Sequence, residues 1–256
     1  MSGVTERGRG AAAIALLAGL AAWEVASRLG GSPVFPPCSH TLVTAWRLVE
    51  SGAIVAPLVA SLGGLVVGFL IAATAGLVVG ALMGVSRTAE HLLDLHVHSL
   101  LAAPSLIFVP VLFGLFGVSR TSQVAVVVIS AFPVIAVNVT AGVRRADPAL
   151  VDMARAFGAR RVHVLRTVVL PGAAPLVAAG LRLGAGRAVK GMVNGEMMIA
   201  LSGLGALIRG YGGRFAVEEL LGVTAIIVVV ALGFTAAASA IGRRVLWRIP
   251  PPGCRP

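Results

Sequence analysis

Apolar positions along the chain gather into six long segments, each followed by a short polar stretch. The segments are 11–26, 57–85, 95–116, 123–143, 175–202 and 220–242. A helix needs about 20 apolar residues to cross the hydrocarbon core of a bilayer. The pattern therefore predicts an all-α polytopic membrane protein with six transmembrane helices.

The composition supports this class. Of 256 residues, 57% are hydrophobic and only 12% are charged, whereas a soluble domain carries about 25% charged residues. This excludes an ordinary soluble domain and a disordered chain, which would be rich in charge. The net charge is +11, but no arginine-rich stretch alternates with aromatic residues, so we do not expect a nucleic-acid partner.

The basic residues instead predict the orientation in the membrane. If the N-terminus is cytoplasmic, 13 of the 21 Lys and Arg residues fall in cytoplasmic segments and five in external loops. Cytoplasmic loops concentrate Lys and Arg, so we expect both ends in the cytoplasm. Arg7 and Arg9 precede the first segment as in a signal peptide, but Trp23-Glu24 stands where a small-residue cleavage site would be. We therefore expect this segment to remain as a span.

These assignments divide the chain into four parts. They are a cytoplasmic tail (1–10), a first span with an external amphipathic segment (11–56), a core transmembrane domain (57–244) and a second cytoplasmic tail (245–256).

Several glycines in the spans are four residues apart. The pairs are Gly64/Gly68, Gly76/Gly80, Gly180/Gly184 and Gly191/Gly195. Glycines at this spacing let two helix backbones approach closely in lipid. We expect these stripes to be packing surfaces.

The loop between the fourth and fifth spans, residues 144–171, carries two further helices. Asp147 can cap a helix and Pro148 suits its first position, while Gly158 suits the left-handed position that ends it. The helix has an apolar stripe at i, i+3, i+4 and i+7, formed by Leu150, Met153, Ala154 and Phe157. A second helix is expected over 160–169, ending near Leu170-Pro171. The stripe could lie on the lipid interface or dock a cytoplasmic partner.

This loop resembles the permease subunits of binding-protein-dependent ABC importers, whose loop has the pattern E-A-A-x3-G-x9-I-x-L-P. The corresponding residues here are Asp152-Met153-Ala154, Gly158, Val168 and Leu170-Pro171. Asp replaces Glu, Val replaces Ile, and Met153 stands where the family has a small alanine.

The resemblance covers about residues 20–245. It includes Trp23-Glu24, Phe35-Pro36-Pro37, Ser86-Arg87, Gly186-Arg187-Ala188, Gly195-Glu196-Met197 and Gly203-Leu204-Gly205. The sequence looks most similar to the branch that imports nitrate, sulfonates, taurine or related compounds, including some pyrimidine precursors.

The resemblance implies the type-I importer permease architecture and a role without catalysis. The first loop helix would be a coupling helix that binds a cytoplasmic ABC ATPase. The residues implied at that contact are Asp152, Met153, Ala154, Arg155, Phe157, Gly158, Ala159, Leu170 and Pro171. The sequence contains no G-x4-G-K-[ST] motif, so we expect ATP and Mg²⁺ to be bound by the partner and no cofactor by this chain. The other implied partners are a second permease copy in a homodimer and an extracytoplasmic solute-binding protein, at the bacterial cytoplasmic membrane.

Polar residues within the spans are candidates for the solute pathway, because charged groups there usually face the bundle interior or water. Lys190 and Asn194 are four apart and can share one helical face, where Lys190 would favour an anion; Arg182 and Arg187 lie nearer the cytoplasmic end and could simply reach that interface. The candidates are Ser105, Phe108, Asn138, Lys190, Asn194, Glu196 and Met197, together with Ser130. Those on the third and fourth spans, Ser105, Phe108, Ser130 and Asn138, are the weaker ones, because a lone Ser or Asn in a span more often bonds to a neighbouring helix or its own backbone. For those on the fifth span, a structural polar contact between helices is an equal alternative.

Two other classes of protein fit the sequence less well. An ATP-independent carrier or channel would need its own ion-coupling site and usually an internal repeat, which the two halves do not show. An integral-membrane enzyme would need a polar cluster at one depth. His91, Asp94 and His98 share a helical face, but such residues commonly mark the solvated end of a span, and no metal site is expected.

Overall fold

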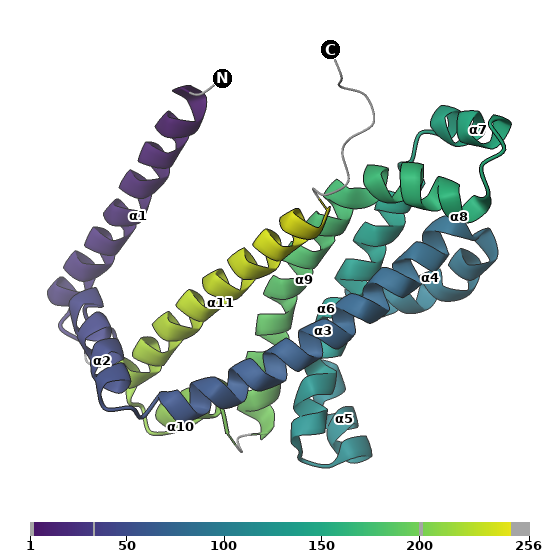
Figure 1. Ribbon diagram of the computed structural model, residues 1–256. Coiled ribbons are helices and arrows are strands. Elements are labelled where there is room, and N and C mark those ends of the chain that lie inside the picture. Colours follow the sequence, from purple (N-terminus) through teal and green to yellow (C-terminus); the bar gives the residue numbers. More distant parts are fainter. Residues whose placement is uncertain (1–2, 33, 200–201, 247–256) are drawn as a thin grey trace.

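The computed structural model describes residues 3–32, 34–199 and 202–246, and the regular elements in these ranges are all helical (Figure 1). The elements are α1 (Gly3–Gly30), α2 (Cys38–Glu50), α3 (Val55–Val85), α4 (Arg87–Ala102), η1 (Ser105–Ile107), α5 (Phe108–Phe116), α6 (Arg120–Arg144), α7 (Pro148–Ala156), α8 (Arg161–Val164), η2 (Leu165–Val169), α9 (Leu170–Ile199), α10 (Leu204–Gly213) and α11 (Val217–Leu246). The predicted all-α class is confirmed.

The centre of the fold is α6, which lies between α3 and α9. The main buried cluster combines apolar side chains of all three helices, and Leu65, Ile135 and Met192 in it are fully buried. Helix α11 packs on α9, and α10 packs on both.

Glycine makes this arrangement possible, because glycine stripes on α3 and α9 both pack closely against α6 and meet at Ile135. A methyl group at Gly76 of α3 would lie 2.8 Å from Cβ of Ile135, and one at Gly184 of α9 would lie 2.5 Å from its Cγ1. Real side chains do not approach so closely. The predicted packing role of the glycine stripes is confirmed at these positions.

The predicted segments coincide with helices where the structure describes them, although residues 200–201 of the fifth lie outside the described residues and the third is not one straight span. Helix α4 and the η1–α5 unit meet at an angle of 93°. Pro104 disfavours a helical conformation for the residue before it, and Ala103 is extended, with ψ of 134°. Within the described residues four helices are long and apolar enough to cross a membrane, and the bent pair would be a fifth. The first predicted segment, 11–26, lies within the 28-residue helix α1, which is not among these candidates, so the described residues support up to five of the six predicted spans.

The ends of the helices fall into two groups (Figure 1). Helix α1 begins, and α11 ends, at the end of the molecule where α7 lies. Helices α2, α5 and α10 lie at the opposite end.

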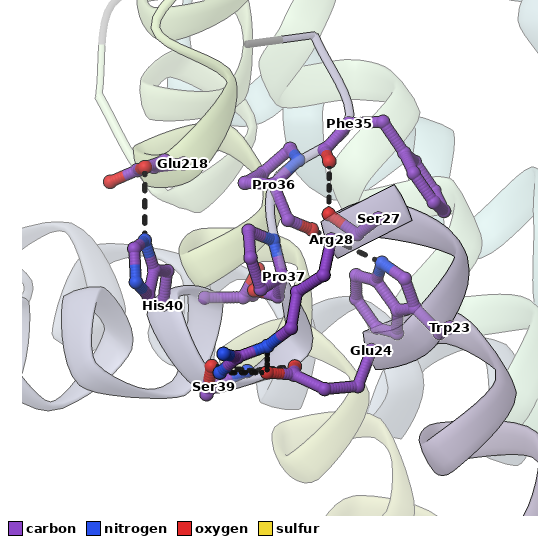
Figure 2. A network of polar contacts seen from close by, with 11 residues as sticks. Trp23, Glu24, Ser27, Arg28, Phe35, Pro36, Pro37, Ser39, His40 and Glu218 are labelled. Carbon is purple, nitrogen blue, oxygen red and sulfur yellow. Dashed lines mark hydrogen bonds and ion pairs between the residues drawn. The ribbon is translucent and has the colours of Figure 1, made fainter. Parts of the chain in front are cut away.

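A polar network attaches α1 to α2 (Figure 2). The Trp23 indole donates to the carbonyl oxygen of Pro36 at 3.2 Å, and the Ser27 hydroxyl donates to that of Phe35. The Glu24 carboxylate accepts from the backbone N–H of Ser39 at 3.0 Å. Thus two sequence motifs that carry the family resemblance form one contact. From α2, His40 reaches Glu218 of α11, with 3.7 Å between Nδ1 and Oε1.

The close packing around Ile135 makes Gly76 intolerant of a methyl group. We expect Gly76→Ala to lower the free energy of unfolding by about 1–3 kcal/mol, because overpacking must displace Ile135 or the helix. Gly63 lies on the same helix with no atom near its Cβ position, so Gly63→Ala is the matched control. Thermal unfolding of both variants in detergent measures the difference, and equal midpoints would contradict the packing described.

Candidate functional site

The loop between α6 and α9 begins with a well-defined short helix. The Asp147 carboxylate accepts from the backbone N–H of Ala149 at 2.9 Å, and Pro148 takes the first position of α7. The helix ends at Gly158, whose φ is +77°. The cap, the first turn and the terminator are therefore those predicted from the sequence.

Helix α7 projects from the bundle (Figure 1), and its apolar stripe is covered only in part. Phe157 is 85% exposed and Met153 is 53% exposed, while Leu150 and Ala154 are half-buried. Asp152 and Arg155 are exposed on the same helix, 3.7 Å apart. An exposed phenylalanine beside charged groups is typical of a protein or membrane contact surface.

The second half of the loop differs from the sequence prediction. Helix α8 and the π-helical turn η2 lead directly into α9, so no break occurs at Leu170-Pro171. Pro171 is the second residue of α9. Proline has no backbone N–H, and in the first turn of an α-helix this N–H has no intrahelical partner to bond. The wider i→i+5 turn before Pro171 accommodates the ring. Leu170 is 39% exposed and Pro171 is half-buried.

A cavity of about 270 Å³ lies at the bend between α4 and α5. Its walls are the bend itself, the middle of α6 and one face of α9. The polar side chains on these walls are Ser105, Ser130, Arg187, Lys190 and Asn194.

The α9 wall gives the cavity its charge. Arg187, Lys190 and Asn194 are at positions i, i+3 and i+7, and therefore share one face of the helix. Both cations are exposed, and among the side chains that the structure describes no carboxylate lies within 4 Å of either one. Two cations without a neighbouring carboxylate favour the binding of an anion.

The predicted pathway residues divide between this cavity and other places. Ser105, Ser130, Lys190 and Asn194 line it, whereas Phe108, Asn138, Glu196 and Met197 do not. The Asn138 amide donates to the carbonyl oxygen of Val134 at 2.8 Å on its own helix. Glu196 is buried in a separate network.

Sequence reasoning did not select Arg187 for the cavity, and interpreted it as an interfacial residue. The signal was available, because Arg187 stands three residues before Lys190 and seven before Asn194. What the sequence did not provide was which face of α9 meets the bend, since that depends on packing.

An ion pair links the loop to the helix that leads to the cavity. Arg144, the last residue of α6, pairs with Glu90 of α4 and donates to the carbonyl oxygen of Met83 at 3.3 Å. Met83 and Val97 are buried against α6 at the same place. The pair therefore fixes α4 to the position where the loop begins, while the far end of α4 forms one wall of the cavity.

Comparison with known proteins identifies the family. The sequence profile described as binding-protein-dependent transport system inner membrane component matches residues 72–249. The chain belongs to this family. It is an ABC transport permease, and the resemblance inferred from the loop is confirmed.

Curated relatives include permeases of the sulfonate and taurine type. The chain is 31% identical over 230 residues to a putative aliphatic sulfonates transport permease, SsuC of Escherichia coli (strain K12), covering 89% of this chain and 87% of that one. It is 31% identical over 163 residues to the taurine transport system permease protein TauC of the same organism, covering 64% of this chain and 59% of TauC. It is 36% identical over 208 residues to the riboflavin transport system permease protein RibX of Chloroflexus aurantiacus, covering 79% and 76%.

The fold of a permease is also found among solved structures. A crystal structure of an amino acid ABC transporter with histidines matches with a TM-score of 0.59 and 20% identity, covering 73% of this chain and 92% of that chain. The helices of the two chains are therefore arranged in space in a similar way.

The Glu90–Arg144 pair generates a charge-exchange prediction. Arg144→Glu places two carboxylates side by side, and we expect the resulting repulsion to lower the unfolding temperature relative to wild type. The double variant Glu90→Arg/Arg144→Glu should recover most of this loss. Thermal unfolding in detergent measures both variants. A double variant that unfolds at the same temperature as Arg144→Glu, or at a lower one, would contradict the pairing.

Proposed function

We propose that this permease forms the translocation pathway of an ATP-driven importer for a small organic solute that carries a sulfonate group, of the alkanesulfonate or taurine type. The observation that carries the proposal is the cavity on α9, where Arg187 and Lys190 lie together without a carboxylate. A sulfonate group carries one negative charge and several acceptor oxygens, which suits two cations with Asn194 and the serine hydroxyls beside them. The names of the sulfonate and taurine relatives support the same solute class.

Helix α7 is the proposed docking element for a cytoplasmic ABC ATPase. Its exposed side chains, Phe157 and Met153, suit an apolar groove, and Asp152 and Arg155 suit a polar rim. Gly158 keeps the end of the helix free of a side chain, and nothing lies near its Cβ position. The ATPase supplies the sites for ATP and Mg²⁺, so this chain is not the enzyme of the complex.

The remaining partners follow from the family. We propose that two copies of the chain form the permease in a bacterial cytoplasmic membrane and that an extracytoplasmic binding protein delivers the solute. Both chain ends and α7 face the cytoplasm in this proposal. It is supported by the excess of Lys and Arg in those segments and by the positions of α1, α7 and α11 at one end of the molecule (Figure 1).

A displacement of the loop between α6 and α9 can be transmitted to the cavity through α4. The ATPase would pull on α7, and Arg144 stands just before α7. Glu90 passes that displacement to α4, and the end of α4 is a wall of the cavity. Two states a few kcal/mol apart are sufficient for ATP and the loaded binding protein to favour one or the other.

The cavity cations generate the first functional prediction. In proteoliposomes that contain the permease, its ATPase and its binding protein, Arg187→Gln and Lys190→Gln should each reduce taurine uptake at least tenfold. Arg182→Gln is the matched control, because Arg182 is exposed on the same helix outside the cavity. Uptake by all three variants at the wild-type rate would contradict an anion pathway along this face of α9.

The proposed docking helix α7 generates the second functional prediction. We expect Gly158→Asp to release the ATPase, because it puts a charge and a side chain into the contact, and co-purification from detergent measures this. Gly52→Asp is the control: Gly52 also has positive φ and open surroundings, but it lies between α2 and α3 at the other end. Normal ATPase association and transport in Gly158→Asp would count against the role of α7.

A further inference from the structure

Glu196 lies near the end of α9 that is remote from α7, and its carboxylate is almost completely buried, with 1% of the residue exposed. One carboxylate oxygen accepts from Nε2 of Gln123 on α6 at 2.5 Å. The other accepts from the backbone N–H of Gly205 on α10 at 2.9 Å. Among the described side chains no cation lies within 4 Å of it, so the partners of this buried carboxyl group are neutral donors.

Ser61 adds the fourth helix to this network. Its hydroxyl oxygen accepts from the backbone N–H of Leu204, the first residue of α10, at 2.9 Å. Helices α3, α6 and α9 therefore all bind the first turn of α10 or the carboxylate that caps it. A satisfied buried network of this kind favours one arrangement of the elements that form it.

Helix α10 begins beside this carboxylate, and its own N-cap residue provides no side-chain hydrogen bond. Its cap residue is Gly203, which has no side chain to bond the free N–H groups of the first turn. A carboxylate from a neighbouring helix supplies the missing acceptor and suits the positive end of the helix dipole. The fit is close, because a methyl group at Gly205 would lie 2.6 Å from Cβ of Glu196.

A glutamate of the preceding helix also caps the N-terminus of α2. The cap residue of α2 is Pro37, which makes no side-chain cap bond. The Glu24 carboxylate of α1 accepts from Ser39 in its first turn (Figure 2). Both α2 and α10 lie at the end remote from α7 (Figure 1). Each of these two short helices is thus attached by a glutamate to the long helix before it.

We infer that Glu196 is a positioning residue, which transmits displacement of α10 to the cavity face of α9. Asn194 precedes Glu196 by two residues and Lys190 precedes it by six, all within one continuous helix. A loaded binding protein that contacts the external end displaces α10, and the carboxylate makes α9 follow. This inference rests on the proposed function, because it needs an external binding protein and an ATPase.

The test is the stimulation of ATP hydrolysis by the binding protein. The complex of permease and ATPase is assayed with and without its binding protein saturated with taurine. In Glu196→Ala the basal rate should stay within twofold of wild type, while the stimulation falls at least fivefold. A merely structural defect would lower both rates together.

Glu196→Gln is the rescue variant. Its amide oxygen can accept from Gly205, and its amide N–H can donate to Gln123 once that side chain turns its own oxygen toward it. We expect it to keep at least half of the wild-type stimulation. Stimulation of Glu196→Ala at the wild-type level would overturn the inference.

A second pair of variants approaches the contact from α10. Gly205→Ala should lose stimulation as Glu196→Ala does, because its methyl group forces α10 off the carboxylate. Gly210→Ala on the same helix has open surroundings and should behave as wild type. If Glu196→Ala and Gly205→Ala both fail to assemble with the ATPase while their controls assemble, the network is only structural and the inference is overturned. A wild-type permease that binds no ATPase, or is not stimulated at all, would instead contradict the proposed function and remove the basis of the inference.

Discussion

The packing of α6 against two glycine stripes is the constraint on which the rest of the structure depends. Ile135 fills the space that both Gly76 and Gly184 leave free. In a bilayer, helices gain nothing by hiding apolar surface from lipid, so close backbone contact and dispersion must hold them together. With α3 and α9 fixed on α6 in this way, one face of α9 is directed toward the bend between α4 and α5, and the charged cavity lies there.

Polar groups attach the remaining elements to this core. Arg144 and Glu90 fix α4 near the start of the loop, Glu24 fixes α2 to α1, and Glu196 fixes α10 to α9. These contacts lie toward the ends of the long helices rather than at the centre of the bundle. The apolar core can therefore stay as one unit while the elements at each end respond to partners, which is what a transport cycle between two states needs.

Much of the fold could be predicted from the sequence, because the bilayer requires long apolar helices and the loop carries strong local signals. The six segments, the Asp147 cap and the Gly158 terminator rest on local chemistry alone. The bend at Ala103 and Pro104 could not be separated from a kinked span, and the π-helical turn that carries the helix through Pro171 depends on register. The cavity was predicted only in part: Ser105, Ser130, Lys190 and Asn194 were selected, but Arg187 was not, because helix orientation is set by packing against α6. Glu196 stood among the pathway candidates, whereas its partners Gln123 and Gly205 come together with it only in the fold.

The most direct test of the account is to purify the detergent-solubilised chain from its native membrane, identify the proteins that come with it, and assay ATP hydrolysis and solute uptake in vesicles. The account predicts that a nucleotide-binding subunit co-purifies and that uptake of a sulfonate-type anion requires ATP and a binding protein. A chain that purifies alone and moves the solute without ATP would contradict it, and would identify the protein as an ATP-independent carrier.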